Sequence, residues 1–516
     1  MKRRDFIKTG SLLTIPVFIN GFGLKLFAGQ PVPNPEEYND NILILIQLDG
    51  GNDTLNTVIP IDQYTNLSKV RSNILIPENK VLKLNEVTGI HPAMSEIRSI
   101  FDEGNLNVIR ATGYPNPNRS HFRSTDIWMS GSAADVYETT GWMGRYFAMD
   151  YPEYPDNFPN DDVNYPFAIS IGSTASETCQ GVSSNYSIAV SNPESSGELF
   201  EGEWDTIPSN CYGSELSFIR DTVRQSNAYS QIVSEAYSKG NNLSTKYNDD
   251  NKLGNNFKTI ARLISGGLKT KVYVVRLGGF DTHSAQVDSV DTTIGRHAEL
   301  LQTLSDAIGA FQDDLELLGE DKRVIGMTFS EFGRRIQSNA SFGTDHGDAV
   351  DVLVFGTCVK GGFTGENPEI SDNVGKKEAV AMQNDFRSVY GSLLIDWFGA
   401  DEQDVKDILY DGFQKLSIVD DCSTTSNKNV INASNSLILS PNPATTKLNI
   451  EFYSGGEQTE ISIYNELGSR LNVIANRKFN AGTQKITVPV SGLTPGVYFI
   501  RTKNNLGQKT ERFVKI

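Results

Sequence analysis

Three continuous apolar runs stand out in the 516-residue chain. They cover Ile42–Leu48, Val272–Leu277 and Val324–Phe329, and each is followed by a polar loop that contains glycine. A longer segment, Ile294–Leu318, repeats its apolar residues with the spacing of an amphipathic helix. Strands that are apolar at every residue are typical of parallel sheets, since helices cover both faces. The pattern therefore predicts an α/β domain with a mostly parallel sheet flanked by helices.

The segment 436–516 has a different pattern. Apolar residues occupy every second position over Leu448–Phe452, and Val497 and Phe499 continue the same spacing toward Arg501. Pro-Asn-Pro, Gly-Gly and Thr-Pro-Gly separate these stretches. Alternation punctuated by turn residues predicts a small, C-terminal all-β sandwich of antiparallel strands. A carbohydrate-binding or adhesive β-module is the alternative interpretation of this segment.

The N-terminal residues predict an export signal. Arg3 and Arg4 precede an apolar stretch over Gly10–Ala28 that Thr14 and Lys25 interrupt. The stretch is too short and too polar to span a bilayer, so we expect a signal peptide at 1–28 and no transmembrane span in the mature protein.

Composition shifts predict the remaining boundaries. Prolines mark a linker at 29–40, and a Ser/Thr/Asn-rich tether covers 421–435. The main domain would then be 41–420. Within it, 150–215 is rich in Asp, Asn, Pro and Ser and is expected to be an irregular insertion.

The charge of the chain excludes one class of partner. The net charge is −17, and the main domain is more acidic still because the C-terminal segment is net positive. Phosphate backbones and anionic membranes require clustered positive charge, so we expect no nucleic acid as partner. The four cysteines lack metal-ligand spacing, and a bridge between Cys179 and Cys211 is left open.

Candidate metal ligands follow the predicted strands. In an open parallel sheet the ligand crevice lies at the carboxyl ends of the strands, where these loops would meet. Carboxylate and imidazole ligands are typical of zinc, with manganese, calcium or iron as alternatives, so we expect one or two divalent ions. The candidate ligands are Asp49, Asp53, Asp281, His283, Glu331, Asp345 and His346.

Several of these assignments stay open on sequence alone. Either Asp49 or Asp53 could be the ligand from the first loop, and Glu331 is a further candidate. His297 lies in the predicted helix, where packing explains it equally well. His91 precedes a proline at a predicted helix start and is interpreted as structural.

A candidate nucleophile lies in the segment Pro-Asn-Arg-Ser-His-Phe. Ser120 is expected to open a helix, whose first N–H groups favour an anion, and a hydroxyl beside a metal would be activated for attack. Plain N-capping is the alternative role. Arg119 could bind an oxyanion of the substrate, as could Arg123, Arg334 and Arg335, although surface ion pairs would explain all four.

The motifs resemble those of a known family. Leu-x-Gly-Gly-Asn-Asp-x-Leu-Asn-Thr, Gly-Gly-Phe-Asp-Thr-His, Ser-Glu-Phe-Gly-Arg-Arg and Gly-Thr-Asp-His-Gly resemble the exported bacterial family called domain of unknown function 1501, over about residues 41–418. That family is similar to the alkaline phosphatase and sulfatase superfamily. The resemblance implies an alkaline phosphatase-like sheet with metals at strand ends, held by Asp49 or Asp53, by Asp281 with His283, and by Asp345 with His346.

The two ends carry resemblances of their own. The first residues resemble a twin-arginine signal, and 436–516 resembles the type A C-terminal sorting domain of the type IX secretion system of Bacteroidota. These imply partners in the export and type IX secretion machinery and a location at the outer-membrane surface or in the extracellular space.

Together these features predict a secreted, metal-dependent hydrolase of phosphate or sulfate esters. The substrate would be a small molecule or linked to a glycan. No Cys-x-Pro-x-Arg segment is present, so a formylglycine sulfatase is excluded. The alternative is a non-catalytic surface binding protein that retains the phosphatase-like fold.

Overall fold

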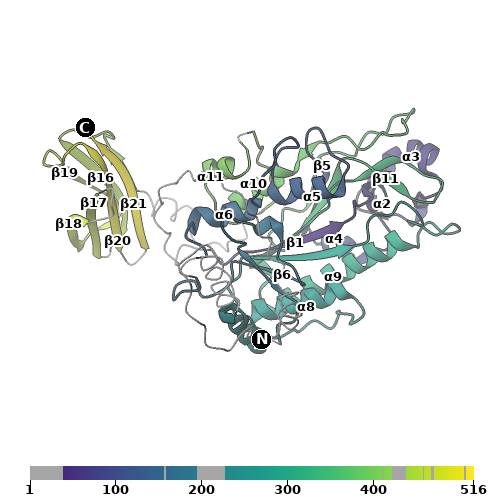
Figure 1. Cartoon of the computed structure of the whole chain (residues 1–516), viewed down its shortest axis with the longest axis horizontal. Helices are drawn as coiled ribbons and strands as arrows, with labels where there is room; N and C mark the ends of the chain where they lie inside the picture. Colours follow the sequence, from purple (N-terminus) through teal and green to yellow (C-terminus); the bar gives the residue numbers. More distant parts are fainter. Residues whose placement is uncertain are drawn as a thin grey trace, which may run out of the picture. The chain divides into compact units, whose positions relative to one another are not determined.

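The structure, a computed structural model, describes residues 39–155, 158–194, 227–410, 412–420, 437–456, 458–465, 470–504 and 507–516. These residues form two compact units, one within Asn39–Cys422 and one within Ser423–Ile516 (Figure 1). The predicted signal peptide (1–28) and tether (421–435) lie outside the described residues, as does the predicted linker up to residue 38.

A nine-stranded, mostly parallel sheet runs through the first unit. β12 is antiparallel to both of its neighbours, β5 and β9, and the other neighbouring pairs are parallel. The strand order is β13 (Gly362–Thr364), β5 (Leu106–Gly113), β12 (Val350–Phe355), β9 (Val324–Phe329), β1 (Ile42–Asp49), β8 (Val272–Gly278), β6 (Ala168–Ile171) and β7 (Ser187–Val190), with β14 (Asn384–Asp385) pairing with β5.

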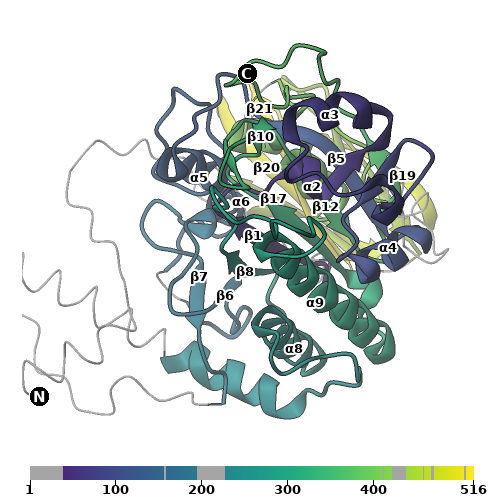
Figure 2. The ribbon, with the colours of Figure 1, turned by 90° about the vertical axis from the view of Figure 1, so that its right-hand side faces the viewer.

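Helices cover both faces of this sheet (Figures 1 and 2). The described helices are α2 (Thr54–Thr57), α3 (Tyr64–Arg71), α4 (Ser95–Asp102), α5 (His121–Ser130), α6 (Trp142–Asp150), α8 (Lys252–Ser265), α9 (Arg296–Leu318), α10 (Phe386–Asp396) and α11 (Glu402–Ile408), and residues 227–239 are also helical. Three-residue helices lie at η1 (Ile61–Gln63), η2 (Glu78–Lys80), η3 (Glu177–Cys179) and η4 (Asp321–Arg323). Two small sheets complete the unit: β2 (Val58–Pro60), β4 (Thr88–Ile90) and β3 (Leu82–Lys83), and the hairpin of β10 (Arg334–Ser338) and β11 (Thr344–His346).

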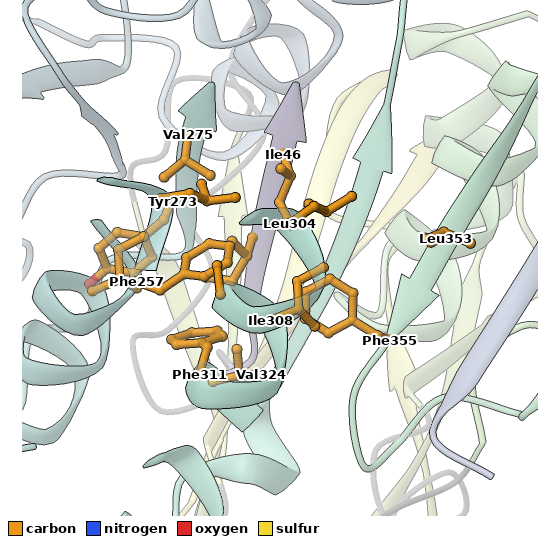
Figure 3. Packing of buried hydrophobic residues seen from close by; sticks show 14 of the residues in the cluster. Ile46, Phe257, Tyr273, Val275, Leu304, Ile308, Phe311, Val324, Leu353 and Phe355 are labelled. Carbon is orange, nitrogen blue, oxygen red and sulfur yellow. The ribbon is translucent and has the colours of Figure 1, made fainter. Parts of the chain in front are cut away.

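Strand β1 explains why the apolar runs are continuous. Its alternate residues Ile44 and Ile46 belong to the core beneath α4, α8 and α9, whereas Leu43 and Leu45 belong to the core beneath α5, α6 and α10. Figure 3 shows the first of these cores, in which side chains of α8 and α9 pack against β1, β8 and β9. The three predicted strands are β1, β8 and β9, and the α/β prediction is confirmed.

The expectation of an irregular insertion at 150–215 was wrong for part of that segment. β6 and β7 lie within it and extend the main sheet beside β8. Each strand has only four residues, and the segments around it are rich in Asp, Asn, Pro and Ser. Neither strand therefore produced a recognisable apolar run in the sequence. Cys179 in the same segment is free and buried, so the bridge to Cys211 is not formed, and Cys358 is disulfide-bonded instead.

The second unit is an antiparallel sandwich, as predicted. One sheet consists of β15 (Leu437–Ser440), β16 (Lys447–Gly455) and β19 (Ala481–Pro489), and the other of β18 (Arg470–Lys478), β17 (Gln458–Asn465), β20 (Gly496–Asn504) and β21 (Gly507–Lys515). Both sheets contribute to one buried core, including Ile450 from β16 and Ile463 from β17. In β20 the core residues are Tyr498 and Ile500, one position away from the predicted alternation. The side chain on the opposite face, Arg501, lies over the Tyr464 ring instead.

Candidate metal centre

The predicted ligand loops meet at one edge of the main sheet. β5, β9, β1 and β8 run in the same direction, so the segments that follow them emerge together. His121 lies beyond β5, Asp281 and His283 lie beyond β8, and His346 ends β11. Ligand atoms of His121, Asp281 and His346 all lie within 4.8 Å of one another, and no other group of this kind occurs among the described residues.

Three imidazoles converge on one carboxylate oxygen, Oδ1 of Asp281. The Nε2 atoms of His283 and His346 lie 3.2 Å and 3.3 Å from it, and Nε2 of His121 lies 3.6 Å from it. Four ligands arranged tetrahedrally at about 2.0–2.1 Å from a zinc ion are separated from one another by about 3.3 Å. The separations from Oδ1 of Asp281 are close to that value. His121, Asp281 and His346 lie mutually close enough to share one divalent ion, whereas His283 lies beside Asp281 and His346 but is not part of that mutual group.

Each imidazole is held through its other nitrogen. Nδ1 of His346 lies 2.8 Å from the backbone oxygen of Arg119, Nδ1 of His121 lies 2.8 Å from Glu331, and Nδ1 of His283 lies 3.3 Å from Asp345. A carbonyl or an ionised carboxylate only accepts hydrogen bonds, so each Nδ1 donates in these pairs. Each Nε2 is then the atom that could bind a cation in place of a proton. Metal-binding histidines in proteins are held in this way.

Two imidazole nitrogens also face each other in the cluster. Nε2 of His283 and Nε2 of His346 are 2.9 Å apart. Two unprotonated nitrogens at that distance repel each other unless a proton or a cation lies between or beside them. The chemistry of this donor set therefore fits a divalent cation.

Arg334 ties the contributing loops together. Its guanidinium is fully buried and donates to the backbone oxygens of Gly51 at 2.7 Å, Phe280 at 3.0 Å and Thr344 at 3.0 Å. It also donates to Oδ1 of Asp281 at 2.7 Å. One cation thus joins the loops after β1 and β8 to strand β11.

Neighbouring groups set the protonation of the cluster. Burial works to raise the pKa of Asp281, but the hydrogen bond and charge of Arg334 outweigh burial, and the pKa lies below its ordinary value. The hydrogen bond to Glu331 raises the pKa of His121, and burial lowers the pKa of His346. An ionised Asp281 and a neutral His346 are the forms that bind metals.

The glycines of the first loop allow the close approach. Gly50 and Gly51 have φ angles of +122° and +81°. A Cβ at Gly50 would lie 2.3 Å from the backbone nitrogen of Asp281, and a Cβ at Gly51 would lie 2.3 Å from the Phe332 ring. Only glycine tolerates both the conformation and the contact.

Neither candidate from that first loop joins the converging set. Asp49 is half exposed and pairs with Arg276 at 2.9 Å. Asp53 is fully buried, and its oxygens accept from Arg71 at 3.1 Å and from Gln286 at 2.6 Å. Burial alone would raise the pKa of Asp53, yet these partners hold the pKa below its ordinary value. The structure therefore gives Asp53 the role of a structural anion.

Glu331 and Asp345 lie behind the histidines. Glu331 is buried and accepts from His121 and from the backbone nitrogen of Gly50 at 2.9 Å. Asp345 accepts from His283 and is paired with Arg335 at 2.8 Å. Both carboxylates orient an imidazole, in contrast to the expectation that they are ligands themselves.

The two remaining histidines take no part. His297 is buried in α9, where Nε2 donates to Oδ1 of Asn52 at 2.9 Å, and burial lowers its pKa to about 4. His91 is buried against it, and burial lowers its pKa to about 3. Their structural interpretation agrees with the contacts.

Ser120 is exposed at the start of α5, directly before His121. Its hydroxyl makes no capping hydrogen bond and has no partner among the described residues. The Asn118 side chain instead accepts from the Ser120 backbone nitrogen at 2.8 Å. The Ser120 hydroxyl therefore does not cap helix α5.

The four candidate oxyanion-binding arginines are already paired. Arg119 holds both oxygens of Asp348 at 2.7 Å, and its Nη1 donates to the backbone oxygen of Lys377. Arg123, Arg334 and Arg335 pair with Asp126, Asp281 and Asp345, respectively. Ion pairing, the second interpretation from the sequence, describes all four.

His121 was not among the ligands predicted from the sequence. It lies in the quoted Arg-Ser-His-Phe segment, beside the proposed nucleophile, and no acidic residue within two positions marked it. Its place at the end of the loop after β5 is the signal that could have identified it, because that loop emerges at the same edge of the sheet as the others.

Two segments match known families. Residues 234–397 match the family described as protein of unknown function (DUF1501). Residues 439–516 match the secretion system C-terminal sorting domain, which indicates export to the cell surface or the extracellular space. The first match includes Asp281, His283 and His346, whereas the segment with Ser120 and His121 precedes it. No curated protein matches the chain.

Similar solved structures are remote. A protein in the alkaline phosphatase superfamily from Vibrio parahaemolyticus has 10% identity and a TM-score of 0.34, over 95% of this chain and 91% of that one. A structure from Bacteroides thetaiotaomicron, from work on glycosaminoglycan metabolism, has 10% identity and a TM-score of 0.31, over 93% and 89%. PorZ, a type IX secretion surface component of Porphyromonas gingivalis, has 13% identity and a TM-score of 0.13, over 19% and 13%. Within the described residues, no helix is long and apolar enough to cross a membrane.

Proposed function

We propose that this protein is an exported, metal-dependent hydrolase of phosphate or sulfate esters. The observation that carries the proposal is the convergence of three oriented imidazoles on Oδ1 of Asp281. A divalent ion bound there, such as zinc, would supply Lewis-acid chemistry to an ester oxygen. His121, His346 and Asp281 would hold it, with His283 beside them as a further candidate ligand.

Ser120 is the proposed nucleophile. Its hydroxyl is exposed and unbonded, and it lies at the positive end of the α5 dipole, where a developing anion is stabilised. The Ser120 oxygen would bond to phosphorus or sulfur and release its proton to water, while the ester oxygen leaves with the alcohol and takes a proton from water. Water would then free the serine and the inorganic anion.

Arg119 has a positioning role in this scheme. Its guanidinium is held by Asp348, so it is not free to bind an oxyanion. Its backbone oxygen fixes the tautomer and the direction of His346. The same residue therefore anchors the Ser120 loop and one metal ligand.

A non-catalytic surface binding protein is the second candidate. The pairing of Arg119, Arg123 and Arg335 favours it, since these three arginines are already held by carboxylates and are not free to bind the substrate anion. This candidate shares the metal cluster but predicts no turnover.

Turnover by the zinc-loaded full chain separates the two candidates. We expect the natural chain to hydrolyse phosphate or sulfate esters. In Ser120→Ala the rate of hydrolysis should fall at least a hundredfold while the bound zinc is retained. Ser68→Ala, an exposed serine of α3, is the matched control and should keep full activity. Absence of turnover across both ester types would favour the binding protein, and full activity of Ser120→Ala would remove Ser120 from the mechanism.

A further inference from the structure

A pocket of about 230 Å³ lies beside the metal centre. Its walls include Tyr114, Pro115, Pro117, Phe332, Val380 and Met382. The pocket is formed where β5 ends and the chain turns toward Ser120, three residues after Pro117.

Phe332 is the wall that the pocket shares with the metal centre. Its ring lies 4.6 Å from the His346 ring and 5.0 Å from the His121 ring, measured between centroids. The ring is buried and packs against Gly51, where a Cβ would lie 2.3 Å from it. Phe332 therefore contacts two of the metal-centre histidines and also lines the pocket.

The lining favours an uncharged, apolar group. Aromatic, proline and aliphatic side chains dominate it, and the Tyr114 hydroxyl is already bonded to Ser124 at 2.9 Å and to the Asn118 backbone nitrogen at 3.1 Å. Asp348 is the charged residue of the lining, and Arg119 holds both of its oxygens. The lining includes no cation that could receive a second anionic group of the substrate.

The size suits a single ring. An apolar cavity of about 150 Å³ in a protein binds benzene. A pocket of about 230 Å³ accommodates one substituted ring. The lining offers a sugar the Asn116 amide and the paired Asp348 as polar side chains, so most of its hydroxyls would lack partners there.

We propose that this pocket is the subsite for the alcohol part of the ester, and that the substrate is the phosphate or sulfate ester of an uncharged phenol. The proposal rests on the proposed function, because the anion of the ester must be held at the metal centre. It names the substrate class of that site, an aryl monoester without a second charge.

Binding of two phosphonates to the zinc-loaded full chain tests the subsite without requiring turnover. Phenylphosphonate and methylphosphonate share the anion and differ in the ring, and calorimetry gives the affinity of each. We expect phenylphosphonate to bind at least tenfold more tightly. A carboxylate on the phenyl ring should remove most of that advantage because it would face Asp348, and tighter binding of the carboxylated ring would contradict the inference.

Two substitutions locate the effect. Met382→Trp fills the pocket, and Ala381→Phe does so from an exposed position, where a larger side chain leaves the fold intact. Both should remove the preference for phenylphosphonate and leave the affinity for methylphosphonate unchanged. Val290→Trp, at a side chain that is 93% exposed and outside the pocket, is the control and should preserve the preference.

The outcomes separate the two proposals. Equal affinity for both phosphonates, or a preference that survives both pocket variants, overturns the subsite while the metal centre still binds the anion. Binding of neither phosphonate overturns the proposed function and the subsite with it.

Discussion

Nε2 of His283 and Nε2 of His346 face each other at 2.9 Å, although the two residues are 63 positions apart in the chain. The opposite nitrogen of each ring is held by an acceptor, Asp345 and the Arg119 backbone oxygen, respectively. Two imidazole nitrogens at this distance need a proton or a cation between them, and a divalent cation held here would satisfy both.

Glu331→Gln should weaken metal binding without unfolding the protein. The carboxylate of Glu331 accepts from Nδ1 of His121 at 2.8 Å. The amide of a glutamine would accept a weaker hydrogen bond, and it could also turn its NH2 group toward the imidazole. Loss of such an orienting partner typically costs about 10–100-fold in metal affinity. Competition with a chromogenic chelator measures the affinity. Glu78→Gln, an exposed glutamate of η2, is the control, and an unchanged affinity in Glu331→Gln would contradict the orienting role.

Gly51→Ala and Gly104→Ala form a matched pair. Both glycines have φ of +81°, but a Cβ at Gly104 meets nothing within 4 Å, whereas at Gly51 it would lie 2.3 Å from the Phe332 ring. The left-handed conformation should cost each variant roughly 1–2 kcal/mol. Gly51→Ala should lose roughly a further 1–3 kcal/mol through overpacking, and should also lose metal affinity. Urea unfolding measures the difference, and equal losses would contradict the close packing of Phe332 on this loop.

Stability should fall as the pH drops below the ordinary pKa of histidine. Burial holds the pKa of His297 at about 4 and that of His91 at about 3 in the folded state. The unfolded chain therefore binds more protons between pH 6.5 and about 4, so the stabilisation is complete above pH 6.5 and is lost as the pH falls. For each histidine the loss from pH 7 to pH 5 should be roughly 2 kcal/mol.

His297→Gln tests this pH dependence. The glutamine amide can still donate to Asn52, as Nε2 of His297 does, but it does not titrate. Urea unfolding in the presence of a chelator should show a shallower loss of stability between pH 7 and pH 5 than in the natural chain. Identical slopes would contradict a neutral, buried His297.

Removal of the sorting domain should leave the metal centre intact. The sandwich has its own core, and the centre is built from side chains of the first unit alone. A chain that ends at Cys422 should keep its zinc content and fail to reach the cell surface, as followed by metal analysis and cell fractionation. Loss of zinc, or arrival of the shortened protein at the surface, would contradict this division of roles.

The apolar runs predicted the fold well because buried parallel strands have a strong local signal. Ile42–Leu48 is apolar throughout since its alternate residues face two different helix layers. β6 and β7 escaped prediction because strands of four residues among polar residues carry no such signal.

The candidate site was predictable as a location and less so as a ligand set. Strand ends identified Asp281, His283 and His346, which the structure brings together. Pattern alone could not show that Asp53 is neutralised by Arg71, that Glu331 stands behind His121, or that Arg119 is held by Asp348. Each of these contacts joins residues far apart in the sequence. The same residue type can be a metal ligand or an ion-pair partner, so the sequence pattern does not separate the two roles.

The central claim is that this cluster binds a metal ion. It is tested most directly by the zinc content and zinc affinity of three proteins: the natural chain, Asp281→Asn, and a double variant with His283→Ala and His346→Ala. Asp372→Asn, an exposed acid paired with Lys69 outside the centre, is the matched control. Elemental analysis after dialysis against zinc should give about one zinc or more per chain for the natural protein and the control, and none for the other two variants while circular dichroism shows that they are folded. A natural chain without zinc, or folded variants that retain it, would contradict the account.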